Sequence, residues 1–464
     1  MSEHSISGFS PPRKLFKLIT VLCFGLSLSV ATVAQAATYY VATTGSDSNP
    51  GTQAAPFKNV QKAVGVVMAG DSVFIRAGSH RAFALRNING AAGAPITFQG
   101  EPGAIIDRNL GGGDGNRNIA FVGGSYITID GLELIDSDQP QLSSDCMGGI
   151  TGRNGIKFDE GNGLHPQHIT VKNMNIHGIL GSAILGSSDY LQFINNHIHD
   201  NGGKKFGATI GAYGTYIKGR YNLISGNRVH NNSGNGIRTG NSTETGMSEL
   251  LVDSIIENNI VYNNGGESPG GSASHGRCKL TNLGDGIVVW HGSGNIIRNN
   301  IVYGSVGYGI RVNEDFGLND KPNLVYNNTV YKNGYQGLYC YEGNKTIVKN
   351  NISFLSGREN IFSGCTNQLS NNLTTDPKFV NPGSGDFGLQ ADSPAIDGGL
   401  DLKAEVPNDF MGTARPQPNP GKYDIGAFEG AGSKANVLPG VGAGIPGGGG
   451  IIPGGGGGVG HCYK

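Results

Sequence analysis

The chain has 464 residues, a formal net charge of -1 and 15% charged residues, so it lacks the strongly basic balance expected of a nucleic-acid-binding protein. It contains 79 glycines, more than twice the usual share of roughly 7%, and a single tryptophan. Part of the glycine lies in residues 430–460, and the rest recurs at expected turns along the body of the chain. This recurrence is the first indication of a repeated fold.

The first 36 residues predict a secretory signal peptide. A basic patch that includes Arg13 and Lys17 precedes an apolar run over residues 18–33, and Ala34-Gln35-Ala36 provides small residues for cleavage. The alternative is an uncleaved anchor helix, but the apolar run is short for a membrane span. No later stretch approaches the ~18 consecutive apolar residues of a span, so we expect a mature protein that is secreted or associated with the cell surface.

The body of the chain opens on a recognisable series of motifs. Tyr39-Tyr40-Val41 is followed by Gly45-Ser46-Asp47-Ser48-Asn49-Pro50-Gly51-Thr52, and then by Ala69-Gly70-Asp71-Ser72-Val73. This series resembles the N-terminal segment of secreted bacterial β-helix proteins, many of which are polysaccharide lyases. The resemblance implies a first strand at Tyr39 and a capping helix over roughly residues 60–67.

An asparagine pair recurs along the chain, each time between two short β-branched segments. The second members are separated by 31, 32, 41, 28, 23 and 21 residues. The shortest intervals fit one coil of a three-faced solenoid, and the longer ones fit coils that carry loop insertions. Asparagine tolerates the left-handed backbone of a sharp corner, and stacked amides can bond from coil to coil. We therefore predict an all-β, right-handed parallel β-helix over residues 38–375. The pairs are Asn195-Asn196, Gly226-Asn227 (where glycine replaces the first asparagine), Asn258-Asn259, Asn299-Asn300, Asn327-Asn328, Asn350-Asn351 and Asn371-Asn372.

A second strand follows most corners and is usually introduced by glycine. Since side chains alternate along a strand, the residue after its inward Ile or Leu is expected to point to solvent. In neighbouring coils about 4.8 Å apart, these residues form a column that is mostly cationic. The predicted column is Lys157, Leu185, Lys218, Arg238, Val288, Arg311 and Tyr339.

The end of the chain falls into two parts. Residues 376–429 contain Asp376-Pro377-Lys378-Phe379, Ser393-Pro394-Ala395-Ile396-Asp397 and Asp424-Ile425-Gly426-Ala427-Phe428-Glu429. They resemble the choice-of-anchor Q region of surface-displayed β-helix proteins, which implies a C-terminal cap. Residues 430–464 are rich in Gly and Pro without apolar periodicity, which predicts a disordered tail.

Four of the six cysteines lie in the body, which suggests two disulfides in an oxidising compartment. Three pairings are possible. We favour Cys340 with Cys365, which are one coil apart, and this leaves Cys146 with Cys278. No CxxC or HxxxH spacing accompanies these cysteines, so no metal site is predicted there.

Lys218 and Arg238 are the candidate catalytic residues. Their spacing resembles that of family 6 polysaccharide lyases, alginate and chondroitin type, in which a lysine base and an arginine lie on adjacent coils. The resemblance implies β-elimination from a uronic acid, with Lys218 as the base and Arg238 as acid or carboxylate clamp. The alternative is a solvated pair of cations on a β-helix face.

The sequence departs from both lyase families at the calcium site. Family 6 enzymes place two glutamates before the lysine to bind Ca²⁺, whereas residues 211–214 here are Gly-Ala-Tyr-Gly. Family 9 pectate lyases use clustered aspartates, and only Asp285-Gly286 corresponds. A calcium cofactor is therefore left open, and no metal ligand is assigned.

Other residues are candidates for substrate binding or for alternative chemistry. Trp290 follows the longest insertion. It is either an exposed tryptophan that suits sugar stacking or a partly buried aromatic covered by that insertion. A pair of carboxylates would instead suit glycoside hydrolysis. An aromatic column that contains His177, His199 and His230 is interpreted as structural. Candidate substrate-binding residues are Lys157, Arg220, Arg311, Trp290, His291 and Tyr339, and candidate acids are Asp159, Asp285 and Glu314.

Three functions remain open. The first is a lyase, or the related C5 epimerase, that acts on a uronate-containing polysaccharide. The second is a β-helix glycoside hydrolase, and the third is a surface protein that binds polysaccharide without turnover. The expected partner is an acidic polysaccharide, with no nucleic acid, and the expected state is a monomer.

Overall fold

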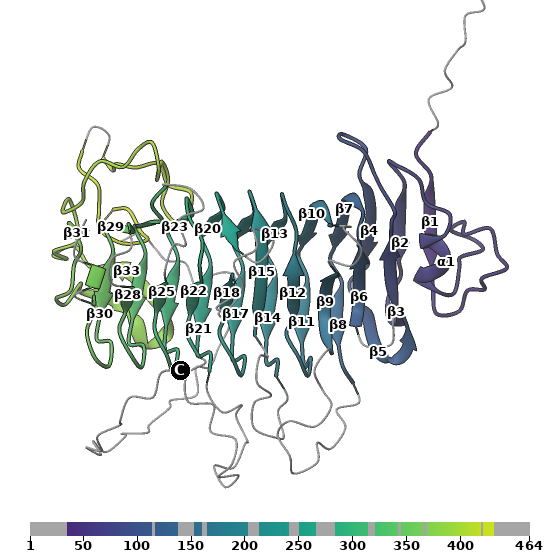
Figure 1. Ribbon diagram of the computed structural model, residues 1–464, viewed down its shortest axis with the longest axis horizontal. Helices are drawn as coiled ribbons and strands as arrows, with labels where there is room; N and C mark the ends of the chain where they lie inside the picture. Colours follow the sequence, from purple (N-terminus) through teal and green to yellow (C-terminus); the bar gives the residue numbers. More distant parts are fainter. Residues whose placement is uncertain are drawn as a thin grey trace, which may run out of the picture. The chain divides into compact units, whose positions relative to one another are not determined.

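The computed structural model describes residues 35–113, 117–137, 153–159, 165–202, 213–240, 250–265, 284–313, 321–341, 345–362, 364–365, 369–418 and 421–430. In the unit that begins at Ala36, the strands form a right-handed parallel β-helix, as predicted. Each full coil contributes one strand to each of three parallel sheets. Figure 1 shows the strands of successive coils side by side, from β1 in purple to β30 in green.

Sheet 1 is formed by the first strand of each coil. Its strands are β1 (Thr38–Val41), β2 (Ser72–Ile75), β4 (Ile96–Gly100), β7 (Ser125–Asp130), β10 (Gln167–Lys172), β13 (Gln192–Ile194), β16 (Leu223–Ser225), β20 (Ile255–Glu257), β23 (Ile296–Arg298), β26 (Leu324–Tyr326), β29 (Ile347–Lys349) and β31 (Leu369–Ser370).

Sheet 2 follows the asparagine corner. Its strands are β3 (Gly78–Arg86), β5 (Ala104–Gly112), β8 (Glu133–Ile135), β11 (Asn175–His177), β14 (His197–His199), β17 (Arg228–His230), β21 (Ile260–Tyr262), β24 (Ile301–Tyr303), β27 (Thr329–Tyr331) and β30 (Ile352–Phe354).

Sheet 3 is formed by the strands that glycine introduces, and the second half of β3 also pairs with it. A short strand, β19 (Leu251–Val252), lies beside the end of β15. The strands of sheet 3 are β6 (Arg117–Val122), β9 (Asn154–Asp159), β12 (Ile184–Ser187), β15 (Thr215–Arg220), β18 (Ile237–Thr239), β22 (Ile287–Val289), β25 (Ile310–Val312) and β28 (Leu338–Cys340).

The core is a stack of apolar side chains that repeats with the coils. In sheet 1, Phe193 is paired in register with Val171 on one side and Ile224 on the other, and all three are fully buried. The alternation of a β-strand explains the stack, because the same inward position is occupied in every coil. Each coil thus buries its apolar face against its neighbours.

The two members of the asparagine pair have separate roles. The first member adopts the left-handed backbone, as at Asn195 with φ 55 and Asn258 with φ 54. The second member forms the ladder: the side-chain amide of Asn196 donates to Asn227 Oδ1 at 2.9 Å, and that of Asn227 donates to Asn259 Oδ1 at 2.9 Å. The predicted left-handed corner and the predicted amide ladder are both confirmed, but each belongs to a different member of the pair.

The two ends of the solenoid differ. At the N-terminal end, α1 (Val60–Val64) provides the expected helix, although it is shorter than predicted. Toward the C-terminus, β32 (Phe379–Asn381), the short 3-10 helix η4 (Pro382–Ser384) and β33 (Asp386–Leu389) pack Phe387 and Leu389 against Tyr303 and Ile352. The segment after residue 376 therefore lies along the outward side of the late coils of sheet 2.

The disulfide between Cys340 and Cys365 is confirmed, with a Cα–Cα distance of 4.9 Å. Cys146 and Cys278 lie outside the described residues, as do nearly all of residues 1–36 and the tail after residue 430. Within the described ranges, no helix has the length and apolarity needed to cross a bilayer.

Candidate functional site

The outward column of sheet 3 differs from the predicted one at a single position. Tyr216, not Lys218, is paired in register with Leu185 on one side and Arg238 on the other. Lys218 lies two residues further along β15 and is paired with Ser187. The prediction that Lys218 occupies the column is therefore wrong at this coil. The physical reason is that β15 has six residues and extends beyond the three-residue β18, so Lys218 lies past the end of that pairing.

Lys218 and Arg238 nevertheless meet at one side chain. Lys218 Nζ lies 5.7 Å from the centroid of the Tyr216 ring, and Arg238 Cζ lies 4.8 Å from it. Alternate residues of a strand share a face, so Tyr216 and Lys218 project to the same side. The two cations are nearly buried, with exposed fractions of 9% and 6%. The ring of Tyr216 thus links the two predicted catalytic residues.

Two tyrosines complete this part of the site. Tyr213 packs edge-on against Tyr216 at 5.5 Å, and Arg238 Cζ lies 4.9 Å from the Tyr213 ring. Burial raises the pKa of Tyr216 above its usual value, although Arg238 and Lys218 act in the opposite direction. The Tyr216 phenol therefore keeps its proton at neutral pH. Sequence reasoning missed both tyrosines, although the position of Tyr216 two residues before Lys218 was a usable signal.

Arginine and aromatic side chains alternate along the next coils. The indole of Trp290 lies between two guanidinium groups, 5.5 Å from Arg238 Cζ and 4.5 Å from Arg311 Cζ. Arg311 also lies 4.8 Å from the ring of Tyr308 and 5.5 Å from that of Tyr339. Of the two alternatives for Trp290, the structure shows the half-buried one, and it brings Trp290 together with Arg238, Arg311 and Tyr339. We call Tyr216, Arg238, Trp290, Arg311 and Tyr339 the cation–aromatic row.

Two buried donors of this row have no hydrogen-bond partner among the described residues. They are Arg238 Nε and Trp290 Nε1. Leaving a buried N–H group without an acceptor costs about 1–3 kcal/mol. Such groups in a folded protein call for an explanation, and a bound acceptor is one.

Asp285 lies beneath the row and is almost completely buried. Its Oδ1 accepts the backbone N–H of Tyr308 at 3.0 Å, and its Oδ2 lies 3.8 Å from Arg311 Nη1. Burial raises the pKa of Asp285 to about 6, although Arg311 opposes this shift. With 2% exposure, this candidate acid lies below the surface that a polymer would contact.

The other predicted residues are distributed more widely. Lys157 lies in the same column, two coils before Tyr216. Arg220 binds Asp189 instead, with its Nη2 donating to Oδ2 at 2.8 Å. His291 is buried and adopts a positive φ of 42. The side chain of Asp159 and all of Glu314 lie outside the described residues.

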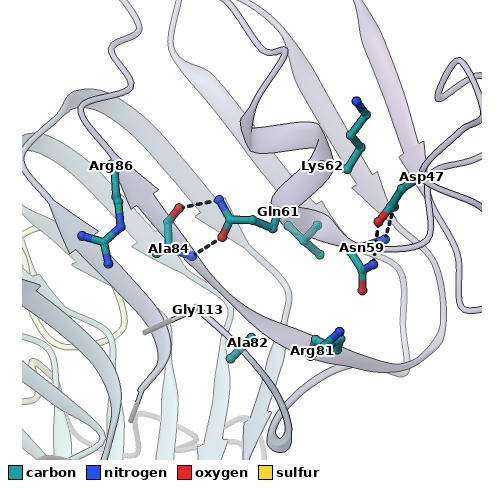
Figure 2. Close-up of a pocket in the computed structure, with 11 residues that line it drawn as sticks. Asp47, Asn59, Gln61, Lys62, Arg81, Ala82, Ala84, Arg86 and Gly113 are labelled. Carbon is teal, nitrogen blue, oxygen red and sulfur yellow. Dashed lines mark hydrogen bonds between the residues drawn. The ribbon is translucent and has the colours of Figure 1, made fainter. Parts of the chain in front are cut away.

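A separate hollow of about 500 Å³ lies at the N-terminal end, between α1 and β3 (Figure 2). Gln61 of α1 binds the backbone of Ala84 through both of its amide atoms, at 3.1 and 2.8 Å. The cations Lys62, Arg81 and Arg86 line this hollow. None of the predicted site residues lines it, so it is distinct from the cation–aromatic row.

Comparison with known proteins bears on this geometry. A family model described as the Pel9A-like, right-handed beta helix region matches residues 39–366. The chain belongs to this family. Pectate lyase L of Paenibacillus polymyxa (strain SC2) is 25% identical over 425 residues, which cover 85% of this chain and 87% of that protein. The finding supports the polysaccharide lyase resemblance in general, and it gives no support to family 6 in particular or to the choice-of-anchor Q region.

Solved structures show the same fold. The crystal structure of pectate lyase Pel9A covers 85% of this chain and 96% of its own, with a TM-score of 0.60 and 22% identity. A rhamnogalacturonan lyase covers 74% of this chain and 90% of its own, with a TM-score of 0.50 and 20% identity.

The described residues do not fit the calcium ion expected of pectate lyase families. Ca²⁺ takes six to eight oxygen ligands, typically from several carboxylates. Near Lys218 and Arg238 the described carboxylates are Asp189, which is bound to Arg220, and Asp285, which is buried beside Arg311. No cluster of three acidic residues occurs among the described side chains. No chemical step is therefore assigned to calcium.

Proposed function

We propose that this chain is a polysaccharide lyase that cleaves a uronate-containing polymer by β-elimination. The observation that carries the proposal is the placement of Lys218 and Arg238 on one tyrosine ring, on the outward face of a Pel9A-like β-helix. The named lyases among its relatives favour polymers of the pectate class as the first substrates to test.

The residues supply each part of the reaction. Lys218 takes the proton from C5 of the uronate, and the electron pair left behind forms the C4–C5 double bond. The C4–O bond then breaks, and the leaving oxygen takes a proton from the Tyr216 phenol. Arg238 binds the substrate carboxylate and offsets the charge that develops next to C5. Solvent restores the tyrosine proton and removes the one on lysine.

The cation–aromatic row would hold the polymer next to these groups. Guanidinium groups pair with uronate carboxylates, and the rings of Trp290 and Tyr339 offer apolar faces to sugar rings. A uronate carboxylate is also the kind of acceptor that the unpartnered N–H groups of Arg238 and Trp290 require. Lys157 extends the positive surface toward earlier coils.

The test follows the ultraviolet absorbance of the unsaturated uronate, which only elimination produces. Purified protein is assayed on polygalacturonate, rhamnogalacturonan, alginate and chondroitin, with calcium and with a chelator. We expect one acidic polymer to give an absorbance signal, and Lys218→Ala should abolish it. Lys157→Ala, which changes a residue in the outward column of sheet 3, should raise KM and leave kcat unchanged. New reducing ends without this absorbance would indicate a hydrolase. Saturable binding without either signal would indicate a binding protein, and both results would overturn the proposal.

Several properties of the whole chain belong to the same proposal. The leader over residues 1–36 supports export, and the choice-of-anchor Q resemblance of residues 376–429 supports display at the cell surface. Mass spectrometry of the mature N-terminus and fractionation of the producing cells test both. Light scattering tests whether the protein is a monomer.

A further inference from the structure

Three histidines gather on the outward face of sheet 2, outside the cation–aromatic row. His197 and His199 are alternate residues of β14, so their side chains project to the same side. His230 of β17 is paired in register with His199 on the next coil. We call His197, His199 and His230 the histidine cluster. From the sequence, the column that includes His199 and His230 is expected to be structural, and His197 lies outside that column.

The nitrogen atoms of this cluster converge. His197 Nε2 and His230 Nε2 face each other at 2.9 Å, and one ring nitrogen from each of the three residues lies within 4.8 Å of the others. A proton can lie between the two facing nitrogens, but both cannot carry one at this distance. At least one lone pair therefore points into the space between the rings.

A carboxylate orients the third ring. His199 Nδ1 lies 2.8 Å from Asp200 Oδ2, and because a carboxylate only accepts, this nitrogen carries the hydrogen. In the neutral ring, Nε2 then carries the lone pair. It lies 3.2 Å from the side-chain amide of Asn175, a contact that a bound ion would replace. A carboxylate bound to the far nitrogen of a histidine is the usual partner of a metal-binding imidazole, since it fixes the tautomer and the ring orientation.

Stacking limits the movement of these rings. His177 stacks on His199 with centroids 4.8 Å apart, and Tyr262 stacks on His230 at 4.5 Å. Two charged groups lie near the histidine cluster, Asp200 and Arg228. The guanidinium of Arg228 donates a hydrogen bond to the Tyr262 hydroxyl.

We propose that His197, His199 and His230 form a binding site for a divalent transition-metal ion such as Zn²⁺. A tetrahedral zinc ion with bonds of about 2.0–2.1 Å holds two nitrogen ligands roughly 3.3 Å apart. The nitrogens of the cluster span this distance, so small rotations of the rings complete the set. Three histidines leave the fourth ligand position for water. Imidazole ligands favour zinc, copper or nickel over calcium and magnesium, which prefer oxygen.

The bound ion would join two coils of the solenoid. It would connect β14 to β17 beside the stacked rings, and an ion that binds only the folded state stabilises it. The site shares no residue with the cation–aromatic row. Its success or failure is therefore independent of the proposed lyase activity.

The experiment measures zinc binding to the full chain without a purification tag. Isothermal titration at neutral pH gives the affinity, and Co²⁺ provides a second probe because its visible spectrum reports tetrahedral coordination. Variants are His197→Ala, His199→Ala and His230→Ala. The matched control is His177→Ala, which removes a stacked ring of the same column but none of the three ligands. Histidines and cysteines elsewhere in the chain contribute equally to all four variants.

We expect saturable Zn²⁺ binding with one tight site and a tetrahedral Co²⁺ spectrum. Each cluster variant should lose about tenfold or more in affinity, whereas His177→Ala should stay close to the wild type. An equal loss in His177→Ala, the absence of a tight site in the wild type, or a thermal shift as large with Ca²⁺ as with Zn²⁺ would overturn the proposal. Circular dichroism confirms folding, and a glutamine substitution at the same position replaces any alanine variant that does not fold.

Discussion

The guanidinium of Arg238 lies over the ring of Tyr216, with Cζ 4.8 Å from the ring centroid. Lys218 contacts the same ring at 5.7 Å, so one side chain sets the separation of the two cations. Tyr216→Phe keeps the ring but removes the phenol, and we expect a fall in kcat of about 10²-fold, the usual contribution of a general acid. Tyr216→Ala should lower kcat further, because both cations lose the ring that positions them. Equal kcat values for Tyr216→Phe and the wild type would exclude the phenol as the acid.

Trp290 is expected to act in binding rather than in the chemical step. Its indole contacts Arg238 and Arg311 at 5.5 and 4.5 Å, and a cation–π contact contributes about 0.5–2 kcal/mol. Trp290→Ala should therefore raise KM by roughly 3- to 30-fold, with a smaller change in kcat. Trp290→Phe keeps an aromatic face and should recover part of the loss. Steady-state kinetics on the polymer that the wild type cleaves measure both constants. A change confined to kcat would contradict a role of Trp290 in binding.

Asp285 should make stability depend on pH in a defined window. Its pKa is raised to about 6 in the folded protein, above the usual 3.8, so the folded state holds the proton more tightly than the unfolded state. The carboxyl therefore favours folding below about pH 4, and this contribution is lost as the pH rises to about 6. Relative to Asp285→Asn, the unfolding free energy of the wild type should fall by about 3 kcal/mol over this range. Urea unfolding at several pH values measures it, and parallel curves for the two proteins would contradict the prediction.

The asparagine corner offers a matched pair of variants. Asn196→Ala removes donors to Val171 O and Asn227 Oδ1 and the acceptor for the Met174 N–H, so the free energy of unfolding should fall by about 3 kcal/mol. Asn195→Gly at the adjacent position keeps the left-handed backbone with φ 55, and it should cost less than about 1 kcal/mol. Denaturant unfolding compares the two. A larger loss in Asn195→Gly would mean that the backbone conformation, rather than the amide ladder, limits stability.

The disulfide and the coil pattern could be predicted because they depend on local repetition. Cys340 and Cys365 are separated by one bare coil, and the parallel stacking of coils brings such residues together. In the same way, the asparagine pairs indicated both the left-handed corner and the amide ladder. The prediction could not assign these two roles to separate residues, since the residues are adjacent in the sequence.

The candidate site was predicted less completely. Lys218 and Arg238 do lie close together, but the register places Tyr216, not Lys218, beside Arg238. The sequence left open whether Trp290 is exposed or partly buried, and it is half-buried between two arginines. Asp285 was a candidate acid, and it lies beneath the row, where its carboxylate accepts the backbone N–H of Tyr308.

The fold class and the period of the coils could be predicted from the sequence, because short patterns repeat from coil to coil and can be recognised without knowing how long each strand is. The N-terminal helix followed from a family resemblance, and Cys340 with Cys365 was the favoured one of three possible cysteine pairings. The tertiary structure alone decided which side chains meet across coils, as at Tyr216 and Arg238 or at His197 and His230. The physical reason is that insertions of different length separate the coils, and only the backbone pairing of the folded strands fixes the register between them.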